Sequence, residues 1–330
     1  MVVIMKKSIN YSINSLKFIA IFSVIAIHCI NVNGMQEKFE ILLGLMRFAV
    51  PVFFLISGFY SYYENNEKAL QKYKTRIIRL LKLIIASNIF YIITTPKFYN
   101  LMNYSTIFNF KSILACLIFN LPLIKGHLWF LDALLYCYIL VFILSKVKIN
   151  LNKFYFIIPL LLIVNLSLGE ISSIIGISIE YFYYRNFIFT GLPFFMIGYL
   201  IHDKLDFIEN NISNKFILLT LLPICGLTII ESTYAITDLY LGTILFSTMI
   251  FIWCILNPNK LNFKITNLIG GKLYGYIYIL HIFVVFTLLK DLSINLGWFN
   301  PILVFTVTTI LSYLVYLFIN KILTLKTQVN

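Results

Sequence analysis

Long apolar runs separated by short polar segments extend along the whole chain. A transmembrane α-helix needs about 20 predominantly apolar residues to cross the roughly 30 Å hydrocarbon core of a bilayer. We predict ten such helices, at residues 13–31, 39–63, 77–95, 129–145, 154–169, 187–201, 216–232, 239–256, 274–289 and 301–320. The segment 105–121 is also apolar, but Asn109, Lys111 and Asn120 interrupt it. The pattern therefore predicts an all-α polytopic membrane protein with about ten transmembrane helices plus one re-entrant or interfacial segment.

Composition supports the same class. Of the 330 residues, 60% are hydrophobic, 17% are aromatic and 12% are charged. A soluble protein of this length could not bury so much apolar surface, because the buried fraction grows slowly with chain length. The sequence contains no long polar stretch and no Gly/Ser linker, so we predict a single integral-membrane domain over residues 1–330.

The distribution of charge predicts orientation. The chain has 26 Lys and Arg against 13 Asp and Glu, a formal net charge of +13. If the N-terminus is inside and 105–121 does not cross, 19 of the 26 basic residues fall on the cytoplasmic side, as the positive-inside rule expects. We therefore predict a multi-pass protein of the cell membrane with both termini cytoplasmic. The basic residues lie between apolar runs instead of on one soluble face, which argues against nucleic-acid binding.

Few ionisable residues lie within the apolar runs, and each is a functional candidate because burying it in a membrane is costly. His28 follows Lys17 by eleven positions, about three helical turns or roughly 16 Å, so both side chains face one side. Lys17 would reach the cytoplasmic surface or bind an anion, and a neutral His28 could take a proton. The structural alternative is a topology-setting lysine and a histidine that binds a backbone carbonyl.

Three features gather around residues 47–58. Arg47 stays charged and needs a partner, and Pro51 would free a backbone carbonyl near it, so a structural kink is an alternative to a functional role. Ser57 and Gly58 are small enough to let another helix approach closely.

A basic helix follows this segment. Arg76, Arg79 and Lys82, with Lys72, share roughly one helical face at the predicted cytoplasmic surface. Such a face suits anionic lipid headgroups and a phosphate-bearing ligand equally well.

Five further residues are candidates for substrate binding or for structural polar contacts. They are Trp129, Asp132, Arg185, Glu231 and His281. We expect Trp129 to lie in an interfacial aromatic belt, and Asp132 and Glu231 are the candidate partners of Arg47 and Arg185. Counting from the inner ends of their spans puts His28 and His281 about 10 Å apart in depth, which argues against a shared metal site. No metal is expected, and the five cysteines lack the CxxC spacing of a metal or redox motif.

Several motifs together resemble the integral-membrane acyltransferase family called acyltransferase 3. Members open with a helix that carries Arg-x10-His, which is Lys17-x10-His28 here, and many place Asp where this chain has Asn14. "RFAVPVFFLISGF" followed by "RIIRLLK" matches the family's Pro-x-Phe-Phe-x-x-Ser-Gly-Phe and basic helix. "HLWFL", "RNFIFTGLPFFMIGYLI" and "YGYIYILHIF" follow in the family's order. In detail the chain looks most similar to the membrane domain of glycopeptide-resistance serine racemases, a domain assigned amino-acid uptake.

The resemblance implies a function and roles for these residues. The protein would move an acyl group, expected to be acetyl, from acyl-CoA to a hydroxyl of a cell-envelope glycan or lipid-linked saccharide. Acyl-CoA would be a co-substrate, and no cofactor is expected to stay bound. His28 would act as general base with Lys17 and Arg47 beside the reacting groups, while His281 would line the cavity near the thioester. Arg76, Arg79 and Lys82 would bind the CoA phosphates, and Ser57 and Gly58 would open a slot for the thioester arm. The alternative is a transporter for a small amino acid such as serine, with Arg47 or Arg185 binding its carboxylate.

Overall fold

The computed structural model describes residues 9–32, 40–94 and 109–329, and every regular element in these ranges is a helix. The chain divides into two compact units, which are described separately below. Unit 1 comprises residues 1–39, 213–221 and 249–330, and unit 2 comprises residues 40–212 and 222–248. Two of the four boundaries fall inside α12 (Asn214–Tyr234) and α13 (Leu241–Leu256). The single domain predicted for residues 1–330 stays a prediction.

Eight helical stretches in the described ranges are long and apolar enough to cross a bilayer. They are Tyr11–Ile30, Leu42–Phe59, Asn66–Thr94, Gly126–Lys146, Ile157–Ile174, Asn214–Tyr234, Lys264–Asp291 and Gly297–Ile322. Two shorter apolar helices, Phe187–Asp203 and Leu241–Leu256, coincide with the other two predicted spans. The all-α polytopic fold class is therefore confirmed, with eight full-length candidates for the approximately ten predicted spans.

The described part of the interrupted segment 105–121 contains one short helix. Residues 105–108 lie outside the described ranges, and α6 (Phe110–Phe119) has 10 residues, about 15 Å of length. Asn109 caps its N-terminus by accepting a hydrogen bond from the Ser112 amide, and Asn120 ends it in the left-handed conformation at φ 56°. A helix of this length covers about half of the hydrocarbon core, in agreement with a segment that does not cross.

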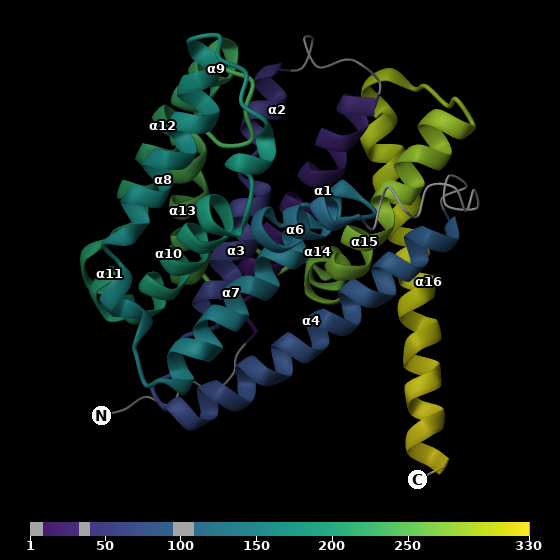
Figure 1. Ribbon diagram of the computed structural model, residues 1–330, viewed down its shortest axis with the longest axis horizontal. Coiled ribbons are helices and arrows are strands. Elements are labelled where there is room, and N and C mark those ends of the chain that lie inside the picture. Colours follow the sequence, from purple (N-terminus) through teal and green to yellow (C-terminus); the bar gives the residue numbers. More distant parts are fainter. Residues whose placement is uncertain (1–8, 33–39, 95–108, 330) are drawn as a thin grey trace. The chain divides into compact units, whose positions relative to one another are not determined.

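Unit 1 is built around the first helix and the last two spans (Figure 1). Its elements are α1 (Tyr11–Val32), α14 (Lys264–Leu268), η9 (Ile269–Leu273), α15 (Tyr274–Val285), η10 (Phe286–Asp291), η11 (Gly297–Phe299), α16 (Asn300–Val329) and parts of α12 and α13. The helix α1 packs against both α15 and α16. A Cβ at Gly270 would overlap with the backbone of Asn14, so this glycine allows the π-helical turn η9 to touch α1.

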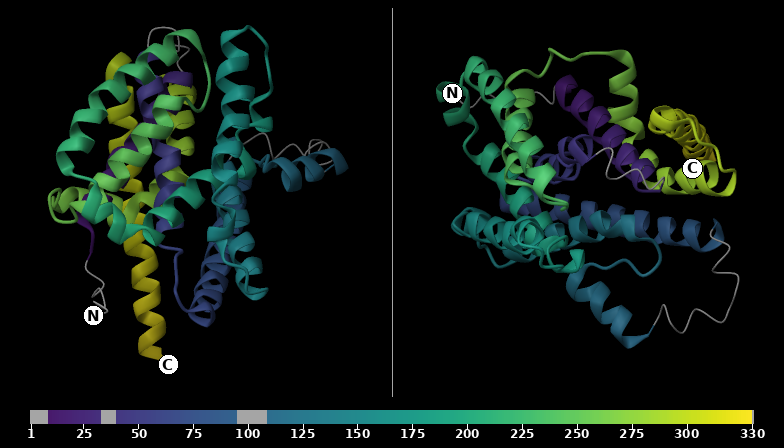
Figure 2. Two further views of the ribbon diagram at one scale, coloured as in Figure 1. Left: turned by 90° about the vertical axis from the view of Figure 1, so that its left-hand side faces the viewer. Right: turned by 90° about the horizontal axis from the view of Figure 1, so that it is seen from above.

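Unit 2 contains the remaining helices. In chain order they are α2 (Glu40–Met46), α3 (Ala49–Phe59), α4 (Asn66–Thr94), α6, η4 (Gly126–Leu128), α7 (Trp129–Lys146), η5 (Leu151–Phe154), α8 (Ile157–Leu166), η6 (Ser167–Ile171), α9 (Ser172–Ile174), η7 (Tyr181–Tyr183), η8 (Phe187–Gly191), α10 (Leu192–Asp203), α11 (Leu205–Asn211) and the adjoining parts of α12 and α13. The long helix α4 packs along α7 (Figure 2).

Two glycines bring α3 and α10 into backbone contact. A Cβ at Gly58 would overlap with the carbonyl of Phe195, and a Cβ at Gly198 would overlap with the carbonyl of Leu55. Ser57 donates to the carbonyl of Phe53 within its own helix, at 2.8 Å. The predicted slot beside Ser57 and Gly58 is therefore wrong, because the backbone of α10 fills that space. The small residues serve close helix packing.

The predicted span 39–63 is broken at Arg47 and Phe48, between α2 and α3. The break does not arise from Pro51, which is the third residue of α3 and lies in the first helical turn. Amide groups in a first turn have no partner inside the helix, so proline is tolerated there. The break places Arg47 at a helix junction, from which its side chain leaves the apolar surface of α3.

Candidate functional site

His28 on α1 and His281 on α15 lie side by side in unit 1. Their ring centroids are 5.1 Å apart, with the ring planes inclined by 46°. The predicted difference of about 10 Å in depth is therefore wrong. The helical stretch that carries His281 begins at Lys264, ten residues before the predicted start at Tyr274. Both histidines lie 17 residues beyond the first residue of their helical stretches, Tyr11 and Lys264.

The two helices run in the same direction. Asn14 donates to Asn267 at 3.2 Å, the Lys17 ammonium lies 4.8 Å from the centroid of the Tyr274 ring, and His28 meets His281 further along. Lys17 thus makes a cation–π contact inside unit 1. The predicted arrangement of Lys17 and His28 on one helical face agrees with these contacts, since both face α15.

The environment of His281 defines its tautomer. Its side chain is fully buried, and its Nδ1 lies 2.6 Å from the carbonyl oxygen of Tyr278. A carbonyl can only accept a hydrogen bond, so Nδ1 carries the proton and Nε2 of the neutral ring carries the lone pair. This hydrogen bond to the backbone of its own helix orients the His281 ring beside His28. Within the described part of the chain, no group of three or more His, Cys, Asp or Glu side chains is arranged to hold a metal ion.

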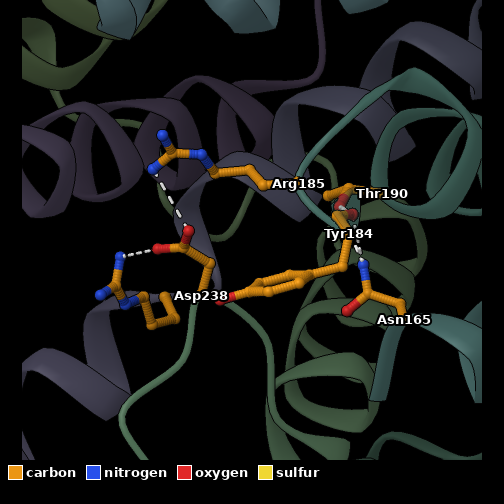
Figure 3. Close-up of polar contacts among 6 residues, drawn as sticks. Asn165, Tyr184, Arg185, Thr190 and Asp238 are labelled. Carbon is orange, nitrogen blue, oxygen red and sulfur yellow. Dashed lines mark hydrogen bonds and ion pairs between the residues drawn. The ribbon is translucent and has the colours of Figure 1, made fainter. Parts of the chain in front are cut away.

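Two arginines of unit 2 share one carboxylate. Asp238 Oδ1 lies 2.5 Å from Arg47 Nη1, and Asp238 Oδ2 lies 3.2 Å from Arg185 Nη1 (Figure 3). The predicted partners of Arg47 and Arg185, Asp132 and Glu231, are therefore wrong. Asp132 makes no ion pair with any residue in the described ranges. We refer to Arg47, Arg185 and Asp238 as the arginine clamp.

Buried polar contacts hold the segment that carries Arg185. The amide of Asn165 on α8 donates to the carbonyl of Tyr184 at 2.9 Å and to Thr190 Oγ1 at 3.0 Å (Figure 3). Asn186 caps η8 by accepting from the amides of Ile188 and Phe189. These contacts fix the residues on both sides of Arg185, so the position of its guanidinium is set by the fold.

Aromatic rings surround the Arg185 guanidinium. Its Cζ lies 4.0 Å from the centroid of Tyr181 and 5.6 Å from that of Trp129. Trp129 is 9% exposed, so the predicted role in an interfacial aromatic belt is wrong and the ring lies within unit 2. Burial, and then the charge of Asp238, raise the pKa of the Tyr184 hydroxyl, which therefore stays protonated at neutral pH.

Glu231 has a structural partner instead of an arginine. Its Oε2 accepts from the amide of Gly242 at 2.8 Å, and Glu170 Oε2 accepts from the amide of Leu241 at 3.2 Å. Two carboxylates thus bind the first amides of α13, where the helix dipole favours negative charge. The loop between α12 and α13 is held further by the Tyr240 hydroxyl, which donates to the Ala235 carbonyl. Asp238 lies in this loop, and the anchored ends fix its position.

The predicted basic face of α4 separates into two parts. Arg76 donates to Ser61 Oγ at 2.7 Å and to the Tyr60 carbonyl at 2.6 Å, so it holds the loop after α3. Arg79 and Lys82 are exposed. A small pocket opens beside the start of α4, lined in part by Tyr63, and its lining includes neither Arg79 nor Lys82.

Comparison with known proteins agrees with the resemblance seen in the motifs. The model of an acyltransferase domain family, acyltransferase 3, matches residues 10–320. The chain therefore belongs to this family of membrane acyltransferases, whose enzymes transfer acyl groups other than aminoacyl groups. Over 244 residues it is 29% identical to the serine/alanine racemase of Enterococcus gallinarum, a match that covers 68% of this chain. The match covers 33% of the length of that racemase, so the chain corresponds to about a third of it. No solved structure matches the chain significantly.

Three residues of the polar contacts around the arginine clamp and the start of α13 were not predicted from the sequence. Asp238 is an acid in a short loop, and nothing in its local pattern distinguishes it from other loop acids. Asn165 interrupts the apolar run of α8, and Glu170 lies in η6 at the end of that predicted span. A polar residue inside a span is the signal that could have identified Asn165.

Proposed function

We propose that the protein transfers an acetyl group from acetyl-CoA to a hydroxyl of a cell-envelope glycan or lipid-linked saccharide. The family match over residues 10–320 carries this proposal, together with the position of the family histidine, His28, beside a second histidine. Transfer of a radiolabelled acetyl group by the purified protein is the experiment that tests it. The orientation we propose has both termini in the cytoplasm and the protein in the cell membrane, supported by the distribution of lysine and arginine.

The proposed reaction needs one base. His28 would take the proton of the acceptor hydroxyl as its oxygen attacks the thioester carbonyl. The new C–O bond forms a tetrahedral oxyanion, the C–S bond then breaks, and the proton on His28 passes to the leaving CoA thiolate. Lys17, on the same face of α1 but roughly 16 Å from His28 along the helix, would supply positive charge for a phosphate of the donor. No resident cofactor is needed, because the thioester supplies the acyl group and the leaving group.

His281 serves in this proposal as a positioning residue for His28. Because its Nδ1 proton binds the Tyr278 carbonyl, its lone pair is on Nε2, and the ring lies 5.1 Å from that of His28. Replacing it with Phe would keep an aromatic ring, slightly larger than imidazole, and remove both nitrogens.

We expect His281→Phe to lower kcat by about 10-fold or more and to leave the KM for acetyl-CoA unchanged. His281→Gln, which carries polar atoms near the Nε2 position, should restore part of kcat. His202→Phe, which removes a histidine of α10, is the control. Steady-state kinetics of the four proteins test the role. A parallel loss of stability and activity in His281→Phe, without rescue by Gln, would indicate a purely structural histidine.

The exposed basic residues of α4 are proposed to bind the phosphates of CoA. We expect the double variant Arg79→Gln, Lys82→Gln to raise the KM for acetyl-CoA by about 10-fold, because each charge-assisted contact to phosphate is lost. Its KM should also depend less on salt than that of the unmodified protein. Lys74→Gln, which removes another exposed lysine of α4, should change neither value. An unchanged KM in the double variant would assign the residues to lipid headgroups.

A transporter for a small amino acid such as serine is the second candidate. The similarity to a serine/alanine racemase over 244 residues favours it. This function predicts saturable uptake of serine into vesicles without acyl-CoA. Measuring uptake and acetyl transfer on one preparation separates the two functions, because only transfer requires acyl-CoA.

A further inference from the structure

The arginine clamp has more positive than negative charge. Arg47 and Arg185 each contribute a guanidinium, and among the described residues Asp238 supplies one carboxylate for both. The neighbouring carboxylates of Glu231 and Glu170 bind the amides of Gly242 and Leu241 at the start of α13. These carboxylates are thus balanced by the positive end of a helix dipole, and they do not pair with the arginines.

The arginines also have donors left over. Each guanidinium offers five N–H groups in a fixed fork, and the contact with Asp238 uses Nη1 of each. In Figure 3 the free end of the Arg185 guanidinium points away from Asp238. The Nε of Arg185 is buried and has no hydrogen-bond partner among the described residues. A guanidinium with unused donors beside a single shared carboxylate can accept a second anion.

The surroundings indicate the size of that anion. The side chains of Arg47, Arg185 and Asp238 are 19%, 25% and 21% exposed, so the clamp is reachable but mostly covered. Tyr181 lies over the Arg185 guanidinium and Trp129 lies beside it. Because these rings cover part of the guanidinium, its accessible nitrogens suit a small planar anion better than a bulky phospholipid headgroup. Asp238 itself shows that a carboxylate can bridge the two guanidiniums.

We propose that the arginine clamp is a binding site for the carboxylate of a small ligand, such as an amino acid or an acidic sugar. Asp238 holds the two guanidiniums in position, and the ligand carboxylate binds the nitrogens that Asp238 leaves unused. All of the residues involved belong to unit 2, and the site does not depend on acyl transfer or on His28.

Ligand-dependent thermal unfolding of the detergent-purified full chain, without acyl-CoA, tests the site. The probes are sodium glucuronate against glucose, and glycine against glycinamide, with sodium chloride matched throughout. We expect glucuronate or glycine to raise the unfolding midpoint, and their uncharged or cationic analogues to leave it unchanged. The identity of the effective carboxylate distinguishes an acidic sugar from an amino acid. Repeating the titration in His28→Ala separates this site from the proposed acyl transfer.

Variants connect the effect to the clamp. Arg185→Gln should abolish the response, and Arg185→Lys, which keeps the charge and loses the fork, should weaken the apparent affinity by about 10-fold. Lys74→Gln should respond like the unmodified chain. If Arg185→Gln does not fold, the apparent affinities of Arg185→Lys and Lys74→Gln for the carboxylate are compared instead, and a weaker affinity in Arg185→Lys alone supports the site. The proposal is wrong if neither carboxylate shifts the midpoint, if the shift persists in Arg185→Lys at full affinity, or if only anionic lipid produces it.

Discussion

Replacing His28 with Ala is expected to lower kcat for acetyl transfer by about 10²- to 10⁴-fold, because a general base contributes a factor of this size. His28 is half-buried on α1 and contacts the ring of His281. The KM for acetyl-CoA should change little, since in the proposed mechanism the imidazole acts on the acceptor hydroxyl and not on the CoA phosphates. Initial rates with the purified variant and unmodified protein provide the measurement.

Folding must be controlled in the same experiment. His28→Gln keeps a polar side chain of similar length but cannot take up the proton, so it should be as inactive as His28→Ala. Elution volume and unfolding midpoint of both variants should match those of the unmodified protein. Substantial activity in His28→Gln would remove the general-base role, and the family membership would stand.

The second large effect is expected at Gly58, and it concerns stability. A Cβ at this position would overlap with the backbone of Phe195, and backbone cannot rotate away as a side chain can. Gly58→Ala must therefore separate α3 from α10, a kind of overpacking that destabilises proteins by about 1–3 kcal/mol or more. Thermal unfolding in detergent should show a clearly lower midpoint.

Gly226→Ala is the matched control. Gly226 lies in α12, and a Cβ there would meet no atom within 4 Å. Since alanine favours the helix over glycine by roughly 0.5–1 kcal/mol, this variant should be as stable as the unmodified protein or slightly more stable. Equal midpoints for Gly58→Ala and Gly226→Ala would contradict the close contact of α3 and α10.

The helices could be predicted from the sequence because long apolar runs report directly on bilayer thickness. The break at Arg47 and Phe48 could not, because Pro51 suggested a kink whereas the chain accommodates this proline in the first turn of α3. The depth of His281 could not be predicted, because the uninterrupted apolar run begins at Tyr274 whereas helical structure extends from Lys264 through the π-helical turn η9.

Contacts between residues that are far apart in the chain could not be predicted from the sequence either. Arg47 and Asp238 are 191 positions apart, and sequence spacing gives no information on such a contact. Asp132 and Glu231 were plausible partners because both are acids in apolar runs, but the amides at the start of α13 take up Glu231. The small residues Ser57 and Gly58 were correctly associated with close approach, whereas the occupant of that space, the backbone of α10, is defined only by the fold.

The central claim is that this chain transfers acyl groups, and the most direct test is transfer of radiolabelled acetyl from acetyl-CoA. The purified protein would be reconstituted in lipid vesicles with a cell-envelope glycan fraction, and glycan-bound label and serine uptake would be measured on the same vesicles. We predict label in ester linkage to the glycan, dependent on His28, with serine uptake no greater than in empty vesicles. Saturable serine uptake without any transfer of label would contradict the account.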